Sequence, residues 1–268
     1  MNYRDRRKGA ITTVLVASEL FLLLIAERRF ARDHARLPRL PRLRRNGTIA
    51  GIAVAASLFV ETPVVLWAAS LSRQCGGTLL SRLRLPPKVR VLVAVACLDY
   101  GMYAWHRALH VVPFLWRLHL VHHADRELDV TTSLRVHAVE IATSAGARAA
   151  LVFALGVNDD EILLWQRLFA MSILFHHANV RLPRWLERGL GTIIVTPGRH
   201  RIHHLAERSF QHSNWSTGLV LWDRLHRTLR DESPSDVLGL PGCYRGEESF
   251  RTLLSLPFTQ QPDPWAID

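Results

Sequence analysis

Apolar residues along this 268-residue chain gather in separate blocks instead of recurring at the spacing of a soluble helix or strand. The blocks are residues 10–26, 48–71, 91–103, 138–157 and 162–175. A complete membrane span takes about 20 apolar residues, a length that only the second block meets comfortably. The pattern therefore predicts an all-α fold, an integral-membrane helical bundle with about four to five spans or re-entrant helices.

The first block follows a basic N-terminus, which makes a signal peptide the first alternative. However, the block contains Glu19 and continues directly into Glu27-Arg28-Arg29, without a small-residue cleavage site. We therefore interpret it as a retained membrane helix. Blocks one and two could also form re-entrant hairpins, with Pro63 at a bend in the second block.

The net charge of +11 is concentrated between the first two blocks, where the chain carries its densest basic run: Arg28, Arg29, Arg32, Arg36, Arg39, Arg42, Arg44 and Arg45. Basic loops beside membrane spans stay cytoplasmic, so this loop is predicted on the cytoplasmic side. If the later blocks cross in turn, the histidine-rich segments reach the same face. Basic stretches also bind nucleic acid, but beside apolar spans anionic lipid headgroups are the usual partner, and no nucleic-acid partner is expected.

Most of the 14 histidines fall into four clusters: His106 and His110; His119, His122 and His123; His176 and His177; His200, His203 and His204. On an α-helix, positions i, i+3 and i+4 share one face, so each cluster is predicted to direct its imidazoles toward one spot. Neutral imidazole is a common ligand of iron, copper, zinc and nickel. Nine or ten convergent histidines are too many for one four-coordinate zinc, which predicts a paired metal centre.

Roles apart from a paired metal centre fit these histidines less well. A lone HxxxH often decorates a surface helix, but the repeat of HxxHH and the presence of all four clusters favour metal binding. The segment HRALH lacks the glutamate of the zinc protease motif HExxH. The cysteines form no CxxC pair, which leaves zinc ribbons, redox dithiols and a disulfide framework without support.

Two acidic residues lie close to the histidine clusters in the sequence. Asp99, inside the third apolar block, precedes His106 by seven positions and shares its helix face. A carboxylate in an apolar span usually has a partner inside the protein. Asp99 is therefore expected either to orient a ligand histidine through its other ring nitrogen or to make a structural hydrogen bond to a neighbouring helix. Glu140, three residues after His137, presents the same alternatives.

The order and spacing of these motifs over residues 98–229 resemble those of the fatty acid hydroxylase/sterol desaturase superfamily. The matching segments are DY at 99–100, WHRALH at 105–110, LWRLH at 115–119, VHH at 121–123, LDVTTS at 128–133, RVH at 135–137 with Glu140, FHHAN at 175–179, TP at 196–197, HRIHH at 200–204, SN at 213–214 and WDRL at 222–225. Two places depart from the family pattern: WDRL continues as HRT instead of FGT, and Ala138 stands where proline is common. Neither change touches a ligand position.

This resemblance implies a membrane-bound, non-haem di-iron oxidoreductase that uses O2 to hydroxylate or desaturate a lipid (fatty acyl, sterol-like or carotenoid), with a histidine-rich cap on the cytoplasmic face. The ligands carried over from the family motifs are His106, His110, His119, His122, His123, His177, His200, His203 and His204. His137 and His176 also lie in family-like segments, either as ligands or as neighbours that orient ligands. The implied cofactor is two Fe ions, which zinc can replace during purification, and no catalytic residue is expected beyond the metal ligands.

Such a reaction needs a separate electron donor, a ferredoxin, cytochrome or reductase, because no GxGxxG, haem or flavin motif occurs in the chain. The expected organisation is residues 1–90 as N-terminal membrane helices with a basic loop, 91–230 as the di-iron domain and 231–268 as a cytoplasmic C-terminal extension. Two other functions stay open. A membrane metal transporter or sensor would spread its ligands along a transmembrane path, and an inactive lipid-binding relative would lack a ligand.

Overall fold

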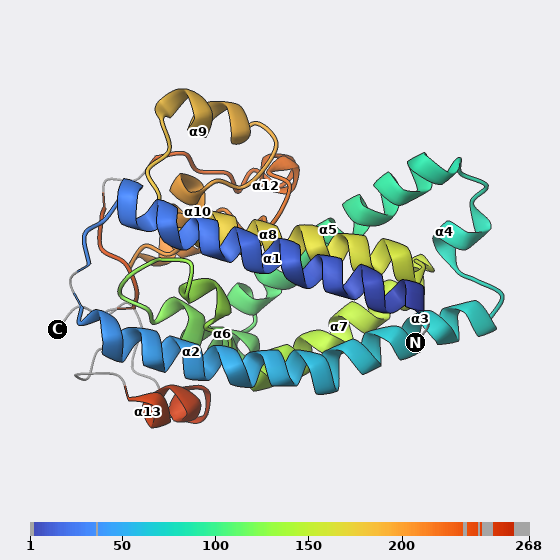
Figure 1. Ribbon diagram of the computed structural model, residues 1–268, viewed down its shortest axis with the longest axis horizontal. Coiled ribbons are helices and arrows are strands. Elements are labelled where there is room, and N and C mark those ends of the chain that lie inside the picture. Colours follow the sequence, from blue (N-terminus) through green and yellow to red (C-terminus); the bar gives the residue numbers. More distant parts are fainter. Residues whose placement is uncertain (1–2, 36, 233–234, 241, 243–248, 260–268) are drawn as a thin grey trace.

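The computed structural model describes residues 3–35, 37–232, 235–240, 242 and 249–259, without the side chains of residues 3–8. Long helices run along its length and shorter ones gather at one end (Figure 1). The long helices are α1 (Tyr3–Phe30), α2 (Arg39–Ala56), α3 (Thr62–Gln74), α5 (Pro87–Val111), α7 (Ala138–Leu155) and α8 (Asp159–His177). The shorter elements include α4 (Leu79–Arg82), α6 (Pro113–His123), η2 (Thr132–Leu134), α9 (Arg184–Leu190), α10 (Pro197–His203), α11 (Arg208–Gln211), α12 (Leu221–Leu225), α13 (Phe250–Ser255) and η4 (Leu256–Phe258). The predicted all-helical fold is confirmed.

The second apolar block forms one long rod, because α2 continues through a single π-helical turn, η1 (Ser57–Glu61), directly into α3 (Figure 1). Pro63 lies in the first turn of α3. A proline ring clashes with the carbonyl four residues earlier in a regular α-helix, and the wider π turn before it relieves that clash. The chain does not turn back at Pro63, so the re-entrant hairpin at this residue is excluded.

Three stretches of the described chain are long and apolar enough to cross a membrane, by length and composition: Gly9–Phe30, Arg39–Arg82 and Ala138–Leu155. α5 and α8, which hold the third and fifth apolar blocks, do not meet this criterion. α8 begins with three acidic residues in its first turn, which suit a helix N-terminus but not a lipid interior. α1 exposes large apolar side chains such as Phe21 and Leu22, as expected of a lipid-facing helix.

α7 and α8 form an adjacent pair whose turn is set by local sequence. α7 ends at Gly156, which adopts a left-handed conformation with φ 69°. α8 begins with a capping box, in which Asn158 and Glu161 each accept a backbone N–H from the other residue. Buried side chains of α3, α5, α7 and α8 pack together, among them Val65, Leu98, Val152 and Trp165. This core fixes the helix ends that carry histidines.

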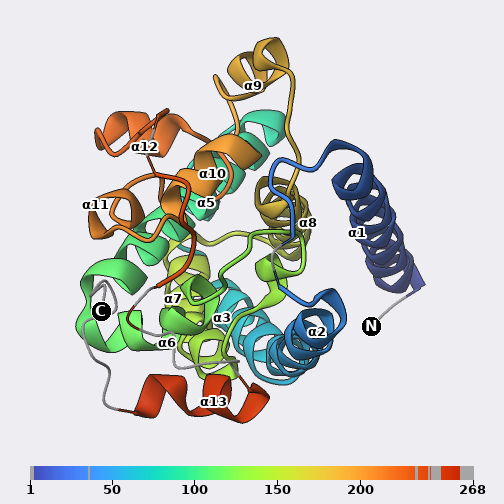
Figure 2. The ribbon, with the colours of Figure 1, turned by 90° about the vertical axis from the view of Figure 1, so that its left-hand side faces the viewer.

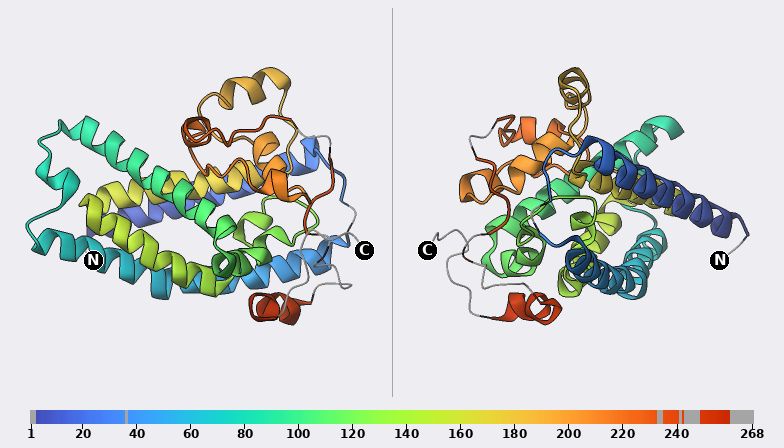
Figure 3. Two further views of the ribbon diagram at one scale, coloured as in Figure 1. Left: turned by 180° about the vertical axis from the view of Figure 1, so that it is seen from behind. Right: turned by 60° about the vertical axis from the view of Figure 1, so that its left-hand side comes forward.

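Short helices cover the end of the bundle at which α1 ends and α2 begins (Figures 1 and 3). Figure 2 looks onto this end, with α10, α11 and α12 on one side and α1 and α2 on the other. Within the predicted C-terminal extension, α13 and η4 pack against α2 and α6 through Leu253 and Leu256, beside Ile49 and Leu120. The cap therefore closes over the ends of the helices that carry the histidine clusters.

Candidate metal centre

Nine buried histidines form two adjacent groups, and within each group the potential ligand atoms lie within 4.8 Å of one another. One group has five members: His106, His110, His119, His123 and His203. The other has four: His122, His177, His200 and His204. They come from α5, α6, α8 and α10, with His204 directly after α10. The fold therefore brings together all nine residues that the family motifs name, although no cluster supplies a group alone.

The expectation that each cluster points at one spot is wrong for both HxxHH motifs. In each motif the first and last histidines share a group, whereas the middle one, His122 or His203, belongs to the other group. Helix geometry explains this division. At about 100° per residue, position i+4 lies about 40° to one side of i, and i+3 lies about 60° to the other side. Each motif therefore serves both groups at once.

The four-histidine group has the chemistry of a metal site. The Nε2 atom of His177 lies 3.1 Å from that of His122 and 3.0 Å from that of His200, which is 3.1 Å from that of His204. The Nδ1–H of His177 donates to the carbonyl of Ile173 at 2.7 Å, which leaves its Nε2 as a lone pair facing other imidazoles. With a metal–nitrogen bond of about 2.1 Å, neighbouring ligands of an octahedral ion lie about 3.0 Å apart.

Buried ring nitrogens without partners indicate that the five-histidine group is also a metal site. Neither ring nitrogen of His110 or His123 has a hydrogen-bond partner among the described residues, and the Nε2 atoms of His119 and His203 also lack one. Buried polar atoms are almost always paired, and this many unpaired nitrogens in one place therefore indicate an ion between them. The donor set of both groups fits transition-metal ions.

The protein environment keeps these imidazoles neutral, the form that binds metal. Burial lowers the pKa of His200, His203 and His204 well below its usual range, and neighbouring histidines lower it further. The pKa values of His122 and His123 are lowered in the same way for the same reasons. A neutral imidazole offers a lone pair at one ring nitrogen, as metal coordination requires.

Hydrogen bonds to the far ring nitrogens fix the direction of several rings. The Nδ1–H groups of His106 and His203 donate to the carbonyls of Trp215 and Ser213, each at 2.8 Å. His119 instead has a carboxylate partner, since its Nδ1 lies 3.0 Å from Oε1 of the buried Glu140. Such partners fix the ring orientation and raise the basicity of the ligand nitrogen.

The two acidic residues singled out in the sequence thus have different surroundings. Glu140 faces a histidine, whereas Asp99 accepts hydrogen bonds from the Leu219 backbone N–H at 2.9 Å and the Trp222 indole N–H at 2.7 Å. Neither of these two donors to Asp99 belongs to a histidine. Asp99 therefore ties α5 to the start of α12, the structural alternative of the two considered for it.

The two additional histidines lie outside both groups. His176 is fully buried with its ring centroid 4.0 Å from that of His200, so it borders the four-histidine group without belonging to it. His137 caps the N-terminus of α7, where its Nδ1 accepts the backbone N–H of Val139 at 3.2 Å, and its Nε2 lies 3.2 Å from the carbonyl oxygen of Leu254. His137 is therefore a helix cap that lies outside both histidine groups.

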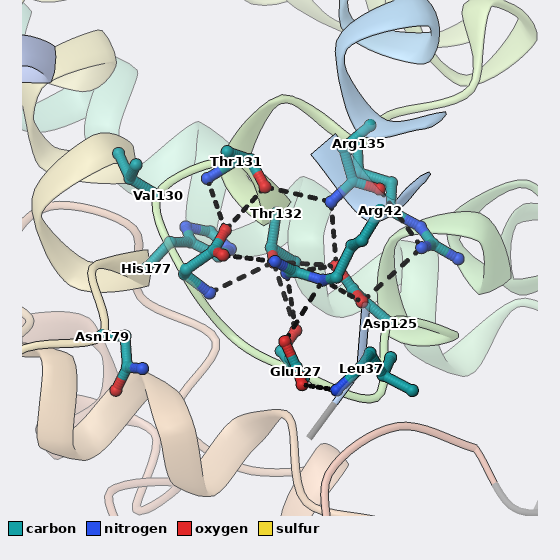
Figure 4. Close-up of polar contacts among 12 residues, drawn as sticks. Leu37, Arg42, Asp125, Glu127, Val130, Thr131, Thr132, Arg135, His177 and Asn179 are labelled. Carbon is teal, nitrogen blue, oxygen red and sulfur yellow. Dashed lines mark hydrogen bonds and ion pairs between the residues drawn. The ribbon is translucent and has the colours of Figure 1, made fainter. Parts of the chain in front are cut away.

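A buried ion network beside the centre has no counterpart among the sequence predictions (Figure 4). Arg42 of α2 binds Asp125 through two hydrogen bonds of 2.8 and 3.1 Å and also contacts Asp129 and Thr132. Asp125 lies two residues after His123. Burial alone would raise the pKa of Asp125, but Arg135 and Arg42 hold that pKa well below its usual range. A spacing of four residues between Arg42 and Asn46, both bonded to Asp125, is the only sequence signal of this contact.

A second set of contacts joins the end of α1 to the end of α8. The carboxylate of Glu27 accepts the backbone N–H groups of Val130 at 2.7 Å and Asn179 at 2.8 Å. The side chain of Asn179 accepts the backbone N–H groups of Arg32 and Asp33 at 3.1 and 2.9 Å. The N-terminal helices therefore hold both loops that follow histidine-bearing helices.

A cavity of about 140 Å³ lies between α5, α6, α7 and α8 and is bordered by histidines of both groups, including His106 and His177. Apolar side chains such as Met102 and Ile173 also line it. Trp105 also lines it and donates its indole N–H to Ser144 at 2.8 Å. The space can thus hold part of an apolar molecule directly beside both groups.

Removing the carboxylate of Glu140 is expected to weaken metal binding by about 10- to 100-fold, because His119 loses the partner that orients its ring. Glu140→Gln should have a smaller effect, since its amide oxygen still accepts the hydrogen bond without the charge. Metal titration of Glu140→Ala, Glu140→Gln and the control Thr143→Ala on the same helix measures this. Equal affinities in Glu140→Ala and the control would contradict the role of Glu140.

Comparison with known proteins finds relatives of the histidine-rich part. The profile of the family described as fatty acid hydroxylase matches residues 91–228. Alkylglycerol monooxygenase of Homo sapiens is 28% identical over 149 residues, covering 53% of this chain and 31% of that protein. Ornithine lipid hydroxylase OlsE of Rhizobium tropici is 27% identical over 178 residues, covering 66% of this chain and 52% of that protein. Fatty acid hydroxylase vlmA of a Lecanicillium species is 26% identical over 156 residues, covering 53% and 42%.

The chain thus spans between 31% and 52% of the length of these relatives. No solved structure matches it significantly. The matched residues 91–228 include all nine histidines of the two groups, whereas α1, α2 and α3 lie outside the match.

Proposed function

Because this chain belongs to the fatty acid hydroxylase family, we propose that it is a membrane-bound di-iron oxygenase that hydroxylates a lipid. The observation that carries this proposal is the cavity bordered by both histidine groups. A lipid chain that enters it would contact imidazoles of the two groups at once. The three candidate membrane spans support a substrate taken from the bilayer.

We assign one iron to each histidine group. Imidazole nitrogens suit iron, copper, zinc and nickel alike, so it is the family that favours iron. Two bound irons would supply the activation of O2 for C–H oxidation, which amino-acid side chains alone do not provide. The nine histidines of the two groups would hold them, and no further catalytic residue is assigned.

The other residues of the site position the ligands and the lipid. Glu140 and the carbonyls of Trp215 and Ser213 orient the rings of His119, His106 and His203. The apolar cavity wall excludes water and sets which carbon of the lipid lies beside the centre, a placement that decides the outcome at the ångström scale. The names of the relatives, a monooxygenase and hydroxylases, favour hydroxylation over desaturation and a substrate with an alkyl or acyl chain.

The cytoplasmic face is the proposed side of the centre. The basic run extends from the end of α1 to the start of α2, at the same end of the bundle as the histidines, since Arg42 binds Asp125 and Asp33 binds Arg201. Positive loops stay cytoplasmic, which supports this orientation. An electron donor such as a ferredoxin, a cytochrome or a reductase would then reach the cap from the cytoplasm. The division into residues 1–90, 91–230 and 231–268 stays a prediction.

The two other functions have less support. A transporter or sensor needs ligands along a path across the membrane, whereas the two groups lie close together near one end of the bundle. An inactive relative is expected to lack a ligand, and all nine positions hold histidine.

The direct test combines metal content with product analysis. Full-length protein purified without oxygen and loaded with ferrous iron is expected to hold about two irons per chain, one in each group. With a chemical reductant and isotopically labelled O2, a lipid extract should then yield a lipid that carries one labelled oxygen atom. Protein that binds no metal after such loading would contradict the proposal, as would loaded protein that labels no lipid in an extract of its own membranes.

A further inference from the structure

An ion pair between Arg148 of α7 and Glu61 at the end of η1 lies inside the helix bundle, with the side chains 15% and 4% exposed. Both residues belong to stretches that are apolar and long enough to cross a membrane. Charged groups at such positions are costly and usually mark a functional site. Glu61 also ends a π-helical turn, a distortion that is frequent at functional sites.

Arg148 lines the cavity that reaches the histidines. Along α7 it lies eight residues after Glu140, the partner of His119. Its guanidinium packs 5.2 Å from the ring centroid of Phe169, which lies eight residues before His177 on α8. Eight helical residues rise about 12 Å. Both helices therefore place the ion pair about two turns away from the histidines along the cavity wall.

The hydrogen bonds of this pair leave several of the five guanidinium N–H donors unused. Nη1 of Arg148 donates to Oε1 of Glu61, and Ser57 Oγ donates to Oε2 of Glu61 at 2.8 Å. Nε of Arg148 is fully enclosed without a hydrogen-bond partner, and Nη2 also has none among the described residues, while the side chain is 15% exposed and lines the cavity. Because leaving a largely buried donor unpaired is costly, the N–H groups of Nη2 are suited to meet an acceptor atom of a ligand in the cavity.

We propose that Arg148 selects lipids that carry a neutral oxygen acceptor, such as an ester, ether or hydroxyl oxygen, at this depth of the cavity. The inference rests on the proposed function, since it names the substrate class of the same cavity. Glu61 already neutralises the guanidinium, so a substrate carboxylate would add an unpaired negative charge. A plain alkyl chain would leave the N–H groups of Nη2 unpaired, and sites built around a polar contact reject analogues that lack it.

Competition between methyl stearate and octadecane tests this selection, because the two differ mainly in the ester group. Native mass spectrometry of the full chain released from detergent micelles measures both complexes. The double variant E61Q/R148M removes the donor without leaving a buried carboxylate unpaired. The affinity ratio of methyl stearate to octadecane is expected to fall about tenfold or more from wild type to this variant. Comparing ratios between proteins cancels the different partitioning of the compounds into micelles.

The matched control is R73M/D159N, which removes an exposed ion pair of 2.9 Å that does not line the cavity and should leave the ratio unchanged. An unchanged ratio in E61Q/R148M would overturn the proposal. A wild-type preference for stearate over methyl stearate would also overturn it, because the selected oxygen would then be charged. The assay needs neither iron nor turnover. Protein that binds no metal but shows the ratio shift would refute only the proposed function, and iron-loaded active protein without the shift would refute only the role of Arg148.

Discussion

Alanine in place of His122 is expected to remove one metal ion from the chain and leave the other bound. His122 belongs only to the four-histidine group, which would keep three imidazoles, while the five-histidine group stays complete. Iron content should fall from about two to about one per chain. Activity should fall by more than about 100-fold, the upper end of the usual cost of losing a ligand's hydrogen-bond partner. Elemental analysis after anaerobic loading with ferrous iron measures the occupancy.

His203→Ala is the matched comparison, since His203 takes the middle position of the other HxxHH motif and belongs to the other group. Four imidazoles would remain there, so this variant is expected to keep its ion better than His122→Ala keeps its own. His137→Ala, which changes a helix cap outside both groups, should keep both ions. Loss of both ions from His122→Ala or from His203→Ala would contradict two separate sites, as would full retention of both ions by His122→Ala.

The division of the histidines shows where sequence reasoning ends. The family motifs name all nine residues of the two groups, and helix periodicity predicts that each HxxHH shares a face. Which side of that face meets which ion depends on how α6 and α10 are placed relative to α5 and α8. That placement is tertiary, and the spacing along one helix does not contain it.

The roles of the carboxylates Asp99 and Glu140 also depend on tertiary placement. Asp99 and Glu140 both lie at helical distances from histidines, so the sequence leaves a ligand-orienting role and a structural role open for each. The choice depends on which neighbour crosses at that level: α6 brings His119 to Glu140, whereas the segment before α12 brings the Leu219 backbone to Asp99. The number of membrane crossings is likewise not determined by the sequence alone, because α5 and α8 are apolar only in part.

The basic run is where the sequence gives the least guidance. Composition alone does not distinguish its arginines, which all count as charges that orient the chain in the membrane. In the structure Arg44 is exposed, whereas Arg42, two residues away, is 6% exposed and paired within the protein. An arginine becomes buried only when a distant segment supplies a carboxylate that pairs with it. For Arg42 this carboxylate is Asp125, in the loop that follows His122 and His123.

Arg42→Met is therefore expected to destabilise the protein by about 3–5 kcal/mol, the usual cost of leaving one partner of a buried ion pair alone. Asp125 would keep Arg135, at 3.7 Å, but lose the two hydrogen bonds from Arg42. Loosening of this loop should also speed the release of metal to a chelator, since His122 and His123 lie directly before it. Thermal unfolding in detergent and the rate of iron loss to a chelator measure the two effects.

Two further variants separate the buried pair from a general effect of charge. Arg44→Met removes a charge from the exposed side of the same helix and should change stability by less than about 0.5 kcal/mol. The double variant Arg42→Met/Asp125→Asn should recover part of the loss, because it leaves no buried carboxylate short of a partner. If Arg42→Met unfolds and releases iron like Arg44→Met, α2 does not hold the loop. If the double variant is no more stable than Arg42→Met, the charge of Asp125 is not what the arginine balances.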